Sequence, residues 1–348
     1  WQRMYDSQKL ARKEESSEAV YTPSVYGALE SRNYLRLDRQ NETLEPTGLA
    51  MAHRLKAYSD LFRFENALTG LIGVLIGAIV VDGASFEFSD VIVVSSFGIS
   101  VMFFMFCWNA YNDITDIEND AMNRPDRPLP SGRLSVNSAR KGMYFSLLVS
   151  ITSLSFGLLE LRREGNLTAV HYSGGIWLLA ILLLISYEGF FGLPGLKHKG
   201  LLGNLCIALA IGMDVIFGAS GMGSPTDAKV ISLALMAVSF SFARELIKDI
   251  EDMDGDYDRA TYPRNVGSEK ARSLAWFLTL TAFVILFIPF LSGIFPQVHA
   301  LLVAPGGVLL MMVKTKLYIS DDRSAQYLIK RSLQVSMAGV IASVFLLT

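Results

Sequence analysis

Long apolar stretches alternate with short polar segments along most of this chain. From about residue 61 onward, nine stretches are each long and apolar enough to cross a bilayer as a helix, which requires about 20 residues. They cover roughly residues 61–81, 91–111, 138–160, 169–187, 201–222, 228–247, 270–290, 293–313 and 328–348. The pattern predicts an all-α fold, a polytopic membrane bundle of about nine transmembrane helices.

The first fifty residues have a different character. They are polar, mixed in charge and without sustained periodicity, whereas the whole chain of 348 residues is 51% hydrophobic and only 18% charged. Polar segments of this kind bury too little apolar surface to fold alone. We therefore expect a disordered or loosely docked extension over residues 1–50 and a membrane-embedded domain over residues 51–348.

The polar segments between the apolar stretches differ in charge on the two sides of the predicted membrane. Those after the second, fourth, sixth and eighth stretches carry eighteen basic residues, whereas the alternate ones carry only Arg162, Arg163 and Lys229. By the positive-inside rule, the eighteen face the cytoplasm. The net charge of −2 and the lack of a basic patch interleaved with aromatic residues argue against a nucleic-acid partner.

A cluster of acidic residues follows the second apolar stretch. Asn112, Asp113, Asp116 and Asp120 come in quick succession, before three prolines between residues 125 and 130 that prevent the helix from continuing. On a helix, Asp113, Asp116 and Asp120 fall within about 60° of one another. Three carboxylates on one face repel one another, so we expect a cationic group among them.

The same spacing returns after the sixth stretch. Asp249, Asp252 and Asp256 repeat the offsets of the first cluster, and Lys248 stands where Asn112 stood. Two acidic clusters at matching positions suggest that the bundle consists of two related halves. Both clusters are predicted on the cytoplasmic side.

Asp and Asn oxygens on two facing helices suit Mg²⁺, above all when a phosphate completes the coordination shell. The candidate metal ligands are Asn112, Asp113, Asp116, Asp120, Asp252 and Asp256. Basic residues near them could hold phosphate oxygens: Arg124, Arg127, Lys197, Lys248 and Arg264. A diphosphate held above apolar helices implies a lipid diphosphate as the substrate. Departure of its diphosphate group would leave an allylic carbocation for an acceptor to capture.

Several of these residues have a second interpretation. Asp249 could be a metal ligand or the base that takes the acceptor's proton, and the spacing does not separate the two. Every loop lysine and arginine could simply be a topology marker. We favour a catalytic role for Arg127 and Lys248, which lie inside the motifs, and a topological role for Arg133 and Arg259.

The motifs NDITDIEND, NRPDRPLPSGRLS and KDIEDMDGD resemble those of the UbiA-type intramembrane prenyltransferases, over about residues 55–348. LFRFENALTG, ARELIKDIEDMDGD and VGSEKARS are similar to the archaeal branch that forms the second ether bond of a lipid core. The resemblance implies Mg²⁺-dependent transfer of a geranylgeranyl group from its diphosphate to geranylgeranylglyceryl phosphate. It also implies that Arg63 and Asn66 reach the substrates. Tyr187 and Lys197 would do so too, although YEGFFGLPGLKHKG departs from the simpler loop expected there.

Three alternatives remain open at this stage. Branches that prenylate aromatic acceptors, of the quinone, chlorophyll or haem type, share both acidic motifs. A cation or lipid transporter could also use inverted repeats with carboxylates, but it would place them at mid-depth, where Asp214 is the main ionisable residue. The third alternative is a membrane-embedded structural subunit of a larger assembly that has kept a prenyltransferase scaffold.

Overall fold

The structure, a computed structural model, describes residues 35–38, 43–46, 48–83, 85–189, 195–255 and 259–346, with side chains from residue 51 onward. The chain divides into two units, residues 1–59 and 60–348. In the first unit, the strands β1 (Leu35–Asp38) and β2 (Thr43–Pro46) pair in antiparallel fashion, and α3 (Gly48–Phe62) begins after them. The rest of the extension predicted over residues 1–50 lies outside the described residues. The hairpin was not predicted because each strand has only four residues.

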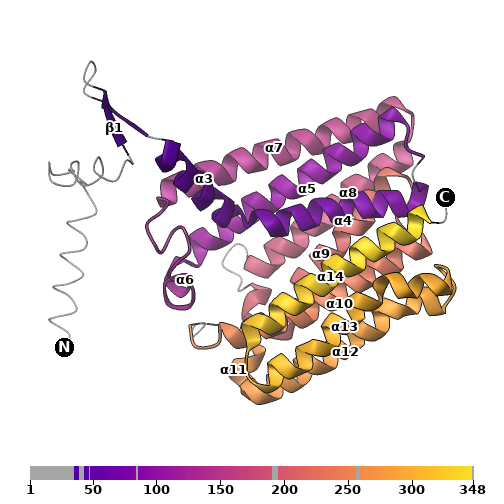
Figure 1. The fold of residues 1–348 in the computed structure, drawn as a ribbon. Helices are drawn as coiled ribbons and strands as arrows, with labels where there is room; N and C mark the ends of the chain where they lie inside the picture. The colour runs from indigo at the N-terminus through magenta and orange to yellow at the C-terminus, as the bar shows by residue number, and fades with distance from the viewer. Residues whose placement is uncertain are drawn as a thin grey trace. The chain divides into compact units, whose positions relative to one another are not determined.

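Nine helices of the described residues are long and apolar enough to span a membrane, which confirms the predicted all-helical bundle (Figure 1). The first five are α4 (Phe64–Asp82), α5 (Phe88–Thr115), α7 (Val136–Arg163), α8 (Leu167–Glu188) and α9 (Leu201–Gly221). The others are α10 (Ala228–Glu251), α12 (Ser268–Leu291), α13 (Ala300–Tyr318) and α14 (Asp322–Phe345). The short segments between them include α6 (Ile117–Asn123), η1 (Leu196–His198), α11 (Tyr262–Val266) and η2 (Gln297–His299).

The last two helices are displaced from their predicted ranges. The eighth span begins with η2, directly after Pro296, rather than at residue 293. Helix α14 begins six residues earlier than predicted, because the Asp321 side chain caps it by accepting a hydrogen bond from the Ser324 backbone at 3.2 Å. Its polar first turns follow no apolar pattern, so hydrophobicity alone does not detect them.

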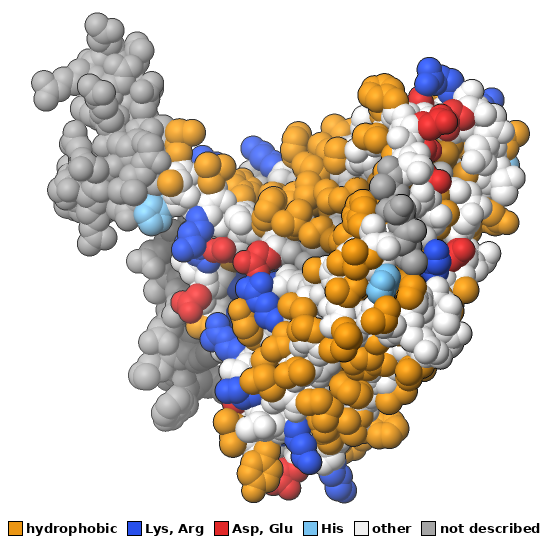
Figure 2. All heavy atoms as spheres, turned by 45° about the vertical axis from the view of Figure 1, so that its right-hand side comes forward, with side chains coloured by type: hydrophobic (Ala, Val, Ile, Leu, Met, Phe, Trp, Pro, Cys, Tyr) orange, Lys and Arg blue, Asp and Glu red, His pale blue; other side chains and the backbone are white. Residues whose placement is uncertain are grey.

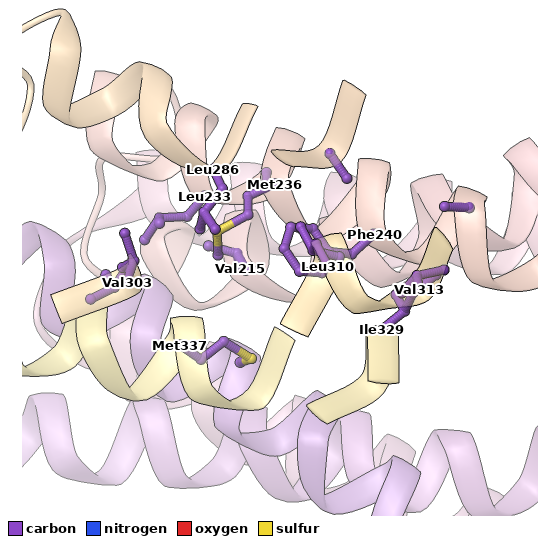
Figure 3. Close-up of a cluster of buried hydrophobic side chains, with 14 of the residues drawn as sticks. Val215, Leu233, Met236, Phe240, Leu286, Val303, Leu310, Val313, Ile329 and Met337 are labelled. Atoms are coloured by element: carbon purple, nitrogen blue, oxygen red, sulfur yellow. The ribbon is translucent and has the colours of Figure 1, made fainter. Parts of the chain in front are cut away.

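Close helix contacts hold the bundle together where glycines allow the backbones to approach. A Cβ on Gly77 of α4 would lie 1.9 Å from the Val215 carbonyl oxygen of α9, and one on Gly218 of α9 would lie 1.9 Å from that of Val74. Helices α4 and α9 therefore pack backbone to backbone, as small residues permit in membrane bundles. The larger apolar core surrounds α10, where Phe240 packs among side chains of α9, α12, α13 and α14 (Figure 3).

The two acidic motifs emerge at the same end of the bundle. The first begins in the last turns of α5 and continues into α6, and the second begins in the last turn of α10, close to α11; both lie toward the left in Figure 1. This shared end contains the polar site described next.

Candidate active site

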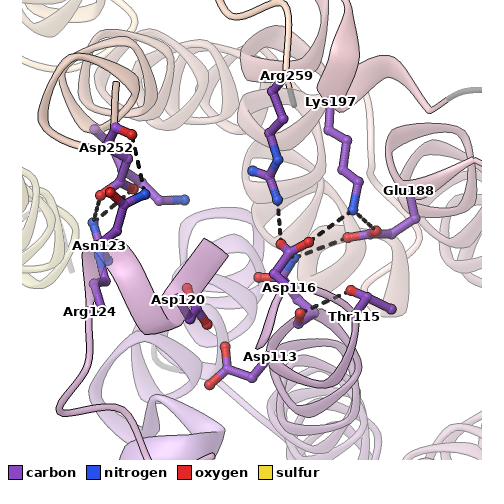
Figure 4. A network of polar contacts seen from close by, with 12 residues as sticks. Asp113, Thr115, Asp116, Asp120, Asn123, Arg124, Glu188, Lys197, Asp252 and Arg259 are labelled. Atoms are coloured by element: carbon purple, nitrogen blue, oxygen red, sulfur yellow. Dashed lines mark hydrogen bonds and ion pairs between the residues drawn. The ribbon is translucent and has the colours of Figure 1, made fainter. Parts of the chain in front are cut away.

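A direct contact joins the two motifs. Arg124, which caps the C-terminus of α6, donates to both carboxylate oxygens of Asp252 at 2.9 and 3.0 Å (Figure 4). Beside it, the Asn123 side-chain amide donates to the Asp252 carbonyl at 3.2 Å. A single guanidinium nitrogen, Nη2, makes both of these charge-assisted bonds to Asp252. The two motifs therefore belong to one polar site.

The first motif is not the single helix that the spacing predicts. Helix α5 ends at Thr115, and Asp116 is at once the C-cap of α5 and the N-cap of α6. The break turns Asp116 toward Lys197 and Arg259, whereas Asp113 and Asp120 both contact Arg127. The prediction that the three carboxylates share one helix face is therefore wrong, because continuous helical geometry stops between them.

The cationic group expected among these acids is provided by arginine side chains. Arg127 donates to Asp120 at 2.5 Å and to Asp113 at 3.3 Å, and Arg63 donates to Asp113 at 2.5 Å. Asp113 is only 1% exposed, so its charge requires these partners. The mutual repulsion of the carboxylates is thereby offset within the described residues.

Arg63 reaches this position through an unusual backbone conformation. It lies between α3 and α4 with φ 49° and ψ 54°, a left-handed conformation that costs a non-glycine residue about 1–3 kcal/mol. Its guanidinium also donates to the side-chain oxygens of Asn109 and Asn112, both at 3.3 Å. These bonds offset the strain and orient the side chain toward the acids.

Asp116 is the centre of a second set of ion pairs (Figure 4). Arg259 donates to it at 2.5 Å and Lys197 at 3.3 Å, while Lys197 also donates to Glu188 at 2.6 Å. The Asn112 amide donates to both Asp116 and Glu188, at 2.8 and 3.2 Å. The sequence patterns did not point to Glu188, and they favoured a topological role for Arg259. Their nearness to Tyr187 and to the second motif was the only available signal.

The remaining candidates on α10 lie close together. The Asn204 side-chain amide of α9 donates to Asp249 at 2.9 Å, and Lys248 donates to Glu245 at 3.1 Å. Glu245, which the sequence analysis also missed, is 8% exposed and accepts a further bond from Arg244 at 3.1 Å.

Two candidates are not placed in this network. Arg264 is exposed, and its guanidinium donates to the Met253 backbone carbonyl at 3.0 Å. Asp256 lies outside the described residues.

The surroundings shift the acidity of the groups in the first motif. Burial tends to raise the pKa of Asp116, but Arg259 and Lys197 outweigh burial and hold it below its ordinary value. For Asp120, burial prevails over Arg127 and the pKa is raised. Burial, with Arg63 nearby, lowers the pKa of Arg127. Of Asp116 and Asp120, Asp116 is thus the one held more firmly in its ionised form.

A cavity of about 290 Å³ opens beneath this network. Arg63, Asn66, Arg127 and Tyr187 are among the polar residues that line it. Its deeper wall is largely apolar and aromatic and includes Phe104, Trp108, Trp177, Ile211 and Phe217. Asp214 of α9 lies on that wall, and the described residues offer it no hydrogen-bond partner. The arrangement suits a ligand with an anionic head and a long apolar tail.

The donor atoms of the two motifs are all carboxylate or amide oxygens, which fit a hard divalent cation. The described part of the chain contains no group of three or more acidic, histidine or cysteine side chains already arranged around one metal position. Instead, Asp113, Asp116, Asp120 and Asp252 each pair with an arginine or a lysine. A bound metal would replace these basic groups as the partner of the carboxylates, and the freed basic groups could then bind phosphate.

Comparison with known proteins identifies the scaffold. Residues 70–334 match the model of the UbiA prenyltransferase family. The chain belongs to this family. It is accordingly a prenyltransferase and an integral, multi-pass membrane protein.

Relatives of this UbiA prenyltransferase include two proteins named digeranylgeranylglyceryl phosphate synthase. The one from Methanosarcina mazei is 34% identical over 258 residues, covering 70% of this chain and 82% of the relative. The one from Haloquadratum walsbyi is 31% identical over 285 residues, covering 81% of this chain and 92% of the relative.

Solved structures have the same fold. The structure of a digeranylgeranylglyceryl phosphate synthase in membranes matches with a TM-score of 0.58 and 25% identity, covering 84% of this chain and 99% of the other. A UbiA homologue from Archaeoglobus fulgidus, bound to GPP and Mg²⁺, matches with a TM-score of 0.53 and 15% identity, covering 81% and 99%.

Proposed function

We propose that this UbiA prenyltransferase transfers a geranylgeranyl group from geranylgeranyl diphosphate to the free hydroxyl of geranylgeranylglyceryl phosphate. The names of the curated relatives support this acceptor. The observation that carries the proposal is the Arg124–Asp252 pair, which joins both acidic motifs at the mouth of an apolar cavity. Such a mouth can bind a diphosphate while the cavity below it takes the tail.

Mg²⁺ is the proposed cofactor, as it is present in the Archaeoglobus fulgidus homologue. The ligands would come from Asn112, Asp113, Asp116, Asp120, Asp252 and Asp256. When bound, the metal would neutralise part of the negative charge on the departing diphosphate.

The basic residues of the network orient the leaving group. Arg124, Arg127 and Lys197, now paired with carboxylates, would donate to diphosphate oxygens once those carboxylates take a metal. Lys248 lines the same cavity and would add positive charge on the side of α10. Arg264, being exposed, would act on the arriving diphosphate rather than within the cavity.

The cavity would favour ionisation of the prenyl diphosphate and protect the resulting allylic cation from water. When the bond between prenyl C1 and the diphosphate oxygen breaks, the electron pair leaves with diphosphate and an allylic cation remains. The rings of Phe104 and Trp177, 5.8 Å apart, and of Trp108 line the cavity below Asn112, where they would stabilise that cation and exclude water. The acceptor oxygen then bonds to C1.

The acceptor's proton goes to a carboxylate, for which we propose Asp249. The Asn204 amide holds one of its oxygens at 2.9 Å and thereby orients the group. Arg63, Asn66 and Tyr187 would position the two substrates at the mouth of the cavity. The active site, by the excess of basic residues at this end, is proposed to face the cytoplasm, and residues 51–348 to form the catalytic domain.

Mass spectrometry of the products tests the proposal. The purified protein is incubated with geranylgeranyl diphosphate, Mg²⁺ and either geranylgeranylglyceryl phosphate or hydroxylated aromatic acids. We expect only the glycerol phosphate acceptor to gain a prenyl group. Asp116→Ala and Asp252→Ala should abolish turnover without unfolding the protein. Prenylation of an aromatic acid instead would replace the acceptor, and near-normal turnover by both variants would exclude the metal-binding roles.

A further inference from the structure

A basic residue on the cavity wall lies apart from the acidic network. Lys330 of α14 lines the cavity, and its ammonium group contacts Glu65 of α4 at 3.0 Å. The Lys330 side chain is 22% exposed, whereas that of Glu65 is 78% exposed. Ion pairs with so exposed a partner contribute little to stability. Lys330 can therefore exchange Glu65 for a stronger anion at little cost.

An apolar wall continues below Lys330 on the same helix face. Leu333 and Met337 follow it at offsets of three and seven residues, and both line the cavity. Gly70 and Gly73 of α4 also line it, and a Cβ on either of them would lie 3.2 Å from the Asp214 side chain. We call this side, formed by Lys330, Leu333, Met337, Gly70 and Gly73, the α4–α14 wall.

The α4–α14 wall differs from the wall formed by α5 and α8. Phe104 and Trp177 on the latter lie beneath the motif that contains Asn112. The cavity thus has two apolar walls, one below Lys330 and one below the motif that contains Asn112. The reaction brings together two lipids that each have an apolar tail. One lipid carries a diphosphate and the other a single phosphate.

We propose that Lys330 binds the single phosphate of the acceptor lipid, whose prenyl chain then lies along the α4–α14 wall. This inference rests on the proposed function. A phosphate monoester carries nearly two negative charges and attracts an ammonium group more strongly than one exposed carboxylate does. Arg124, Arg127 and Lys197 are already engaged by the acids of the site.

The position of Lys330 also suits the reaction. Its partner Glu65 is two residues from Arg63, which contacts Asp113. Arg63 and Lys330 both line the cavity, so a phosphate at Lys330 would place the glycerol part of the acceptor in the same cavity as the network that holds the diphosphate. Lys330 is a positioning residue for the acceptor and takes no part in bond breaking.

Kinetics with Lys330→Met, Lys330→Gln and Lys330→Arg test this assignment. A charge-assisted bond of about 1.5–3 kcal/mol corresponds to a change of roughly 10- to 100-fold. We expect KM for geranylgeranylglyceryl phosphate to rise by that factor in the Met and Gln variants. KM for geranylgeranyl diphosphate should stay within about twofold, and Lys330→Arg should restore most of the acceptor affinity.

Two controls separate charge recognition from structural damage. Lys314→Met removes a lysine of α13 that lies over the Trp276 ring, 5.8 Å from its centroid, and it should leave both KM values unchanged. Glu65→Gln removes the competing carboxylate, so KM for the acceptor should fall by up to about fivefold.

An acceptor without its phosphate completes the test. With geranylgeranylglycerol, the wild type and Lys330→Met should react at the same rate. The inference would be overturned if Lys330→Met lost the same fraction of its rate with both acceptors, or if KM rose equally for the acceptor and for geranylgeranyl diphosphate. Either result would leave the proposed function intact. If the wild type does not prenylate geranylgeranylglyceryl phosphate at all, the proposed function fails, and this inference fails with it.

Discussion

The Arg124 guanidinium donates to both carboxylate oxygens of Asp252, at 2.9 and 3.0 Å, although the two residues are 128 positions apart in the sequence. The pair ties the end of α6 to the end of α10. Burial tends to lower the pKa of Arg124, but the negative charges of Asp252, Glu251 and Asp120 together outweigh burial and raise it. The two halves of the bundle therefore meet through a strong, oriented contact.

Removing this contact should impair catalysis more than folding. Arg124→Met leaves Asp252 without its arginine partner and removes a donor for the diphosphate, so we expect kcat/KM to fall by about 10²–10³-fold. The matched control is Arg133→Met, because Arg133 pairs with Asp60 at 2.6 Å on the surface and both side chains are more than a third exposed. Steady-state kinetics should show the control near wild type. If both variants keep wild-type kcat/KM, Arg124 does not act on the substrate.

Mg²⁺ and the diphosphate should bind cooperatively. Because Asp113, Asp116, Asp120 and Asp252 are paired with arginine or lysine, the metal gains free carboxylates from them only when a diphosphate takes those basic groups. Mg²⁺ alone should shift the melting temperature little. Mg²⁺ together with a non-reactive thiolo-diphosphate analogue at about 100 times its Kd should stabilise the protein by about 2.7 kcal/mol.

Differential scanning fluorimetry with each ligand alone and with both measures this coupling. Ca²⁺ in place of Mg²⁺ provides a control for general charge screening. A full shift with Mg²⁺ alone would contradict the exchange of partners described here.

Asp116 should make the ligand-free protein sensitive to acid. Its pKa lies below the ordinary 3.8, because Arg259 and Lys197 outweigh the effect of burial. A carboxyl whose pKa is lower in the folded state stabilises the protein above the unfolded value, and this contribution is lost as the pH falls toward the folded value. The difference in melting temperature between the wild type and Asp116→Asn should therefore be largest above about pH 5 and shrink below about pH 4. A difference that does not vary with pH would exclude this linkage.

The Asp214 side chain should lower the stability of the folded protein. It lies on the apolar cavity wall in α9, and the residues described around it offer no hydrogen bond. An unpaired polar group in such a place costs about 1–3 kcal/mol. We expect Asp214→Leu to raise the melting temperature and Asp214→Asn, which keeps a polar group there, to leave it near wild type. A loss of stability in both variants would show that the carboxyl is bonded.

The sequence by itself determined the nine membrane helices, the polar extension and the two acidic motifs. Hydrophobicity is a local property, and a run of about 20 apolar residues has few alternatives to a membrane helix. The spacing of the acidic residues within each motif, such as Asp116 and Asp120, was likewise evident from the sequence, since it is a property of the chain alone.

Only the tertiary structure decided which charges meet. The break at Asp116 separates it from Asp113 and brings it to Lys197 and Arg259, the latter 143 positions away. Glu188 and Glu245 likewise enter the site through pairs that no local pattern announces. Such contacts depend on where helices cross and where they end, and small changes in either move a side chain by several ångströms. The sequence therefore predicted most of the residues that the structure brings together in the polar site, and the fold determined their partners.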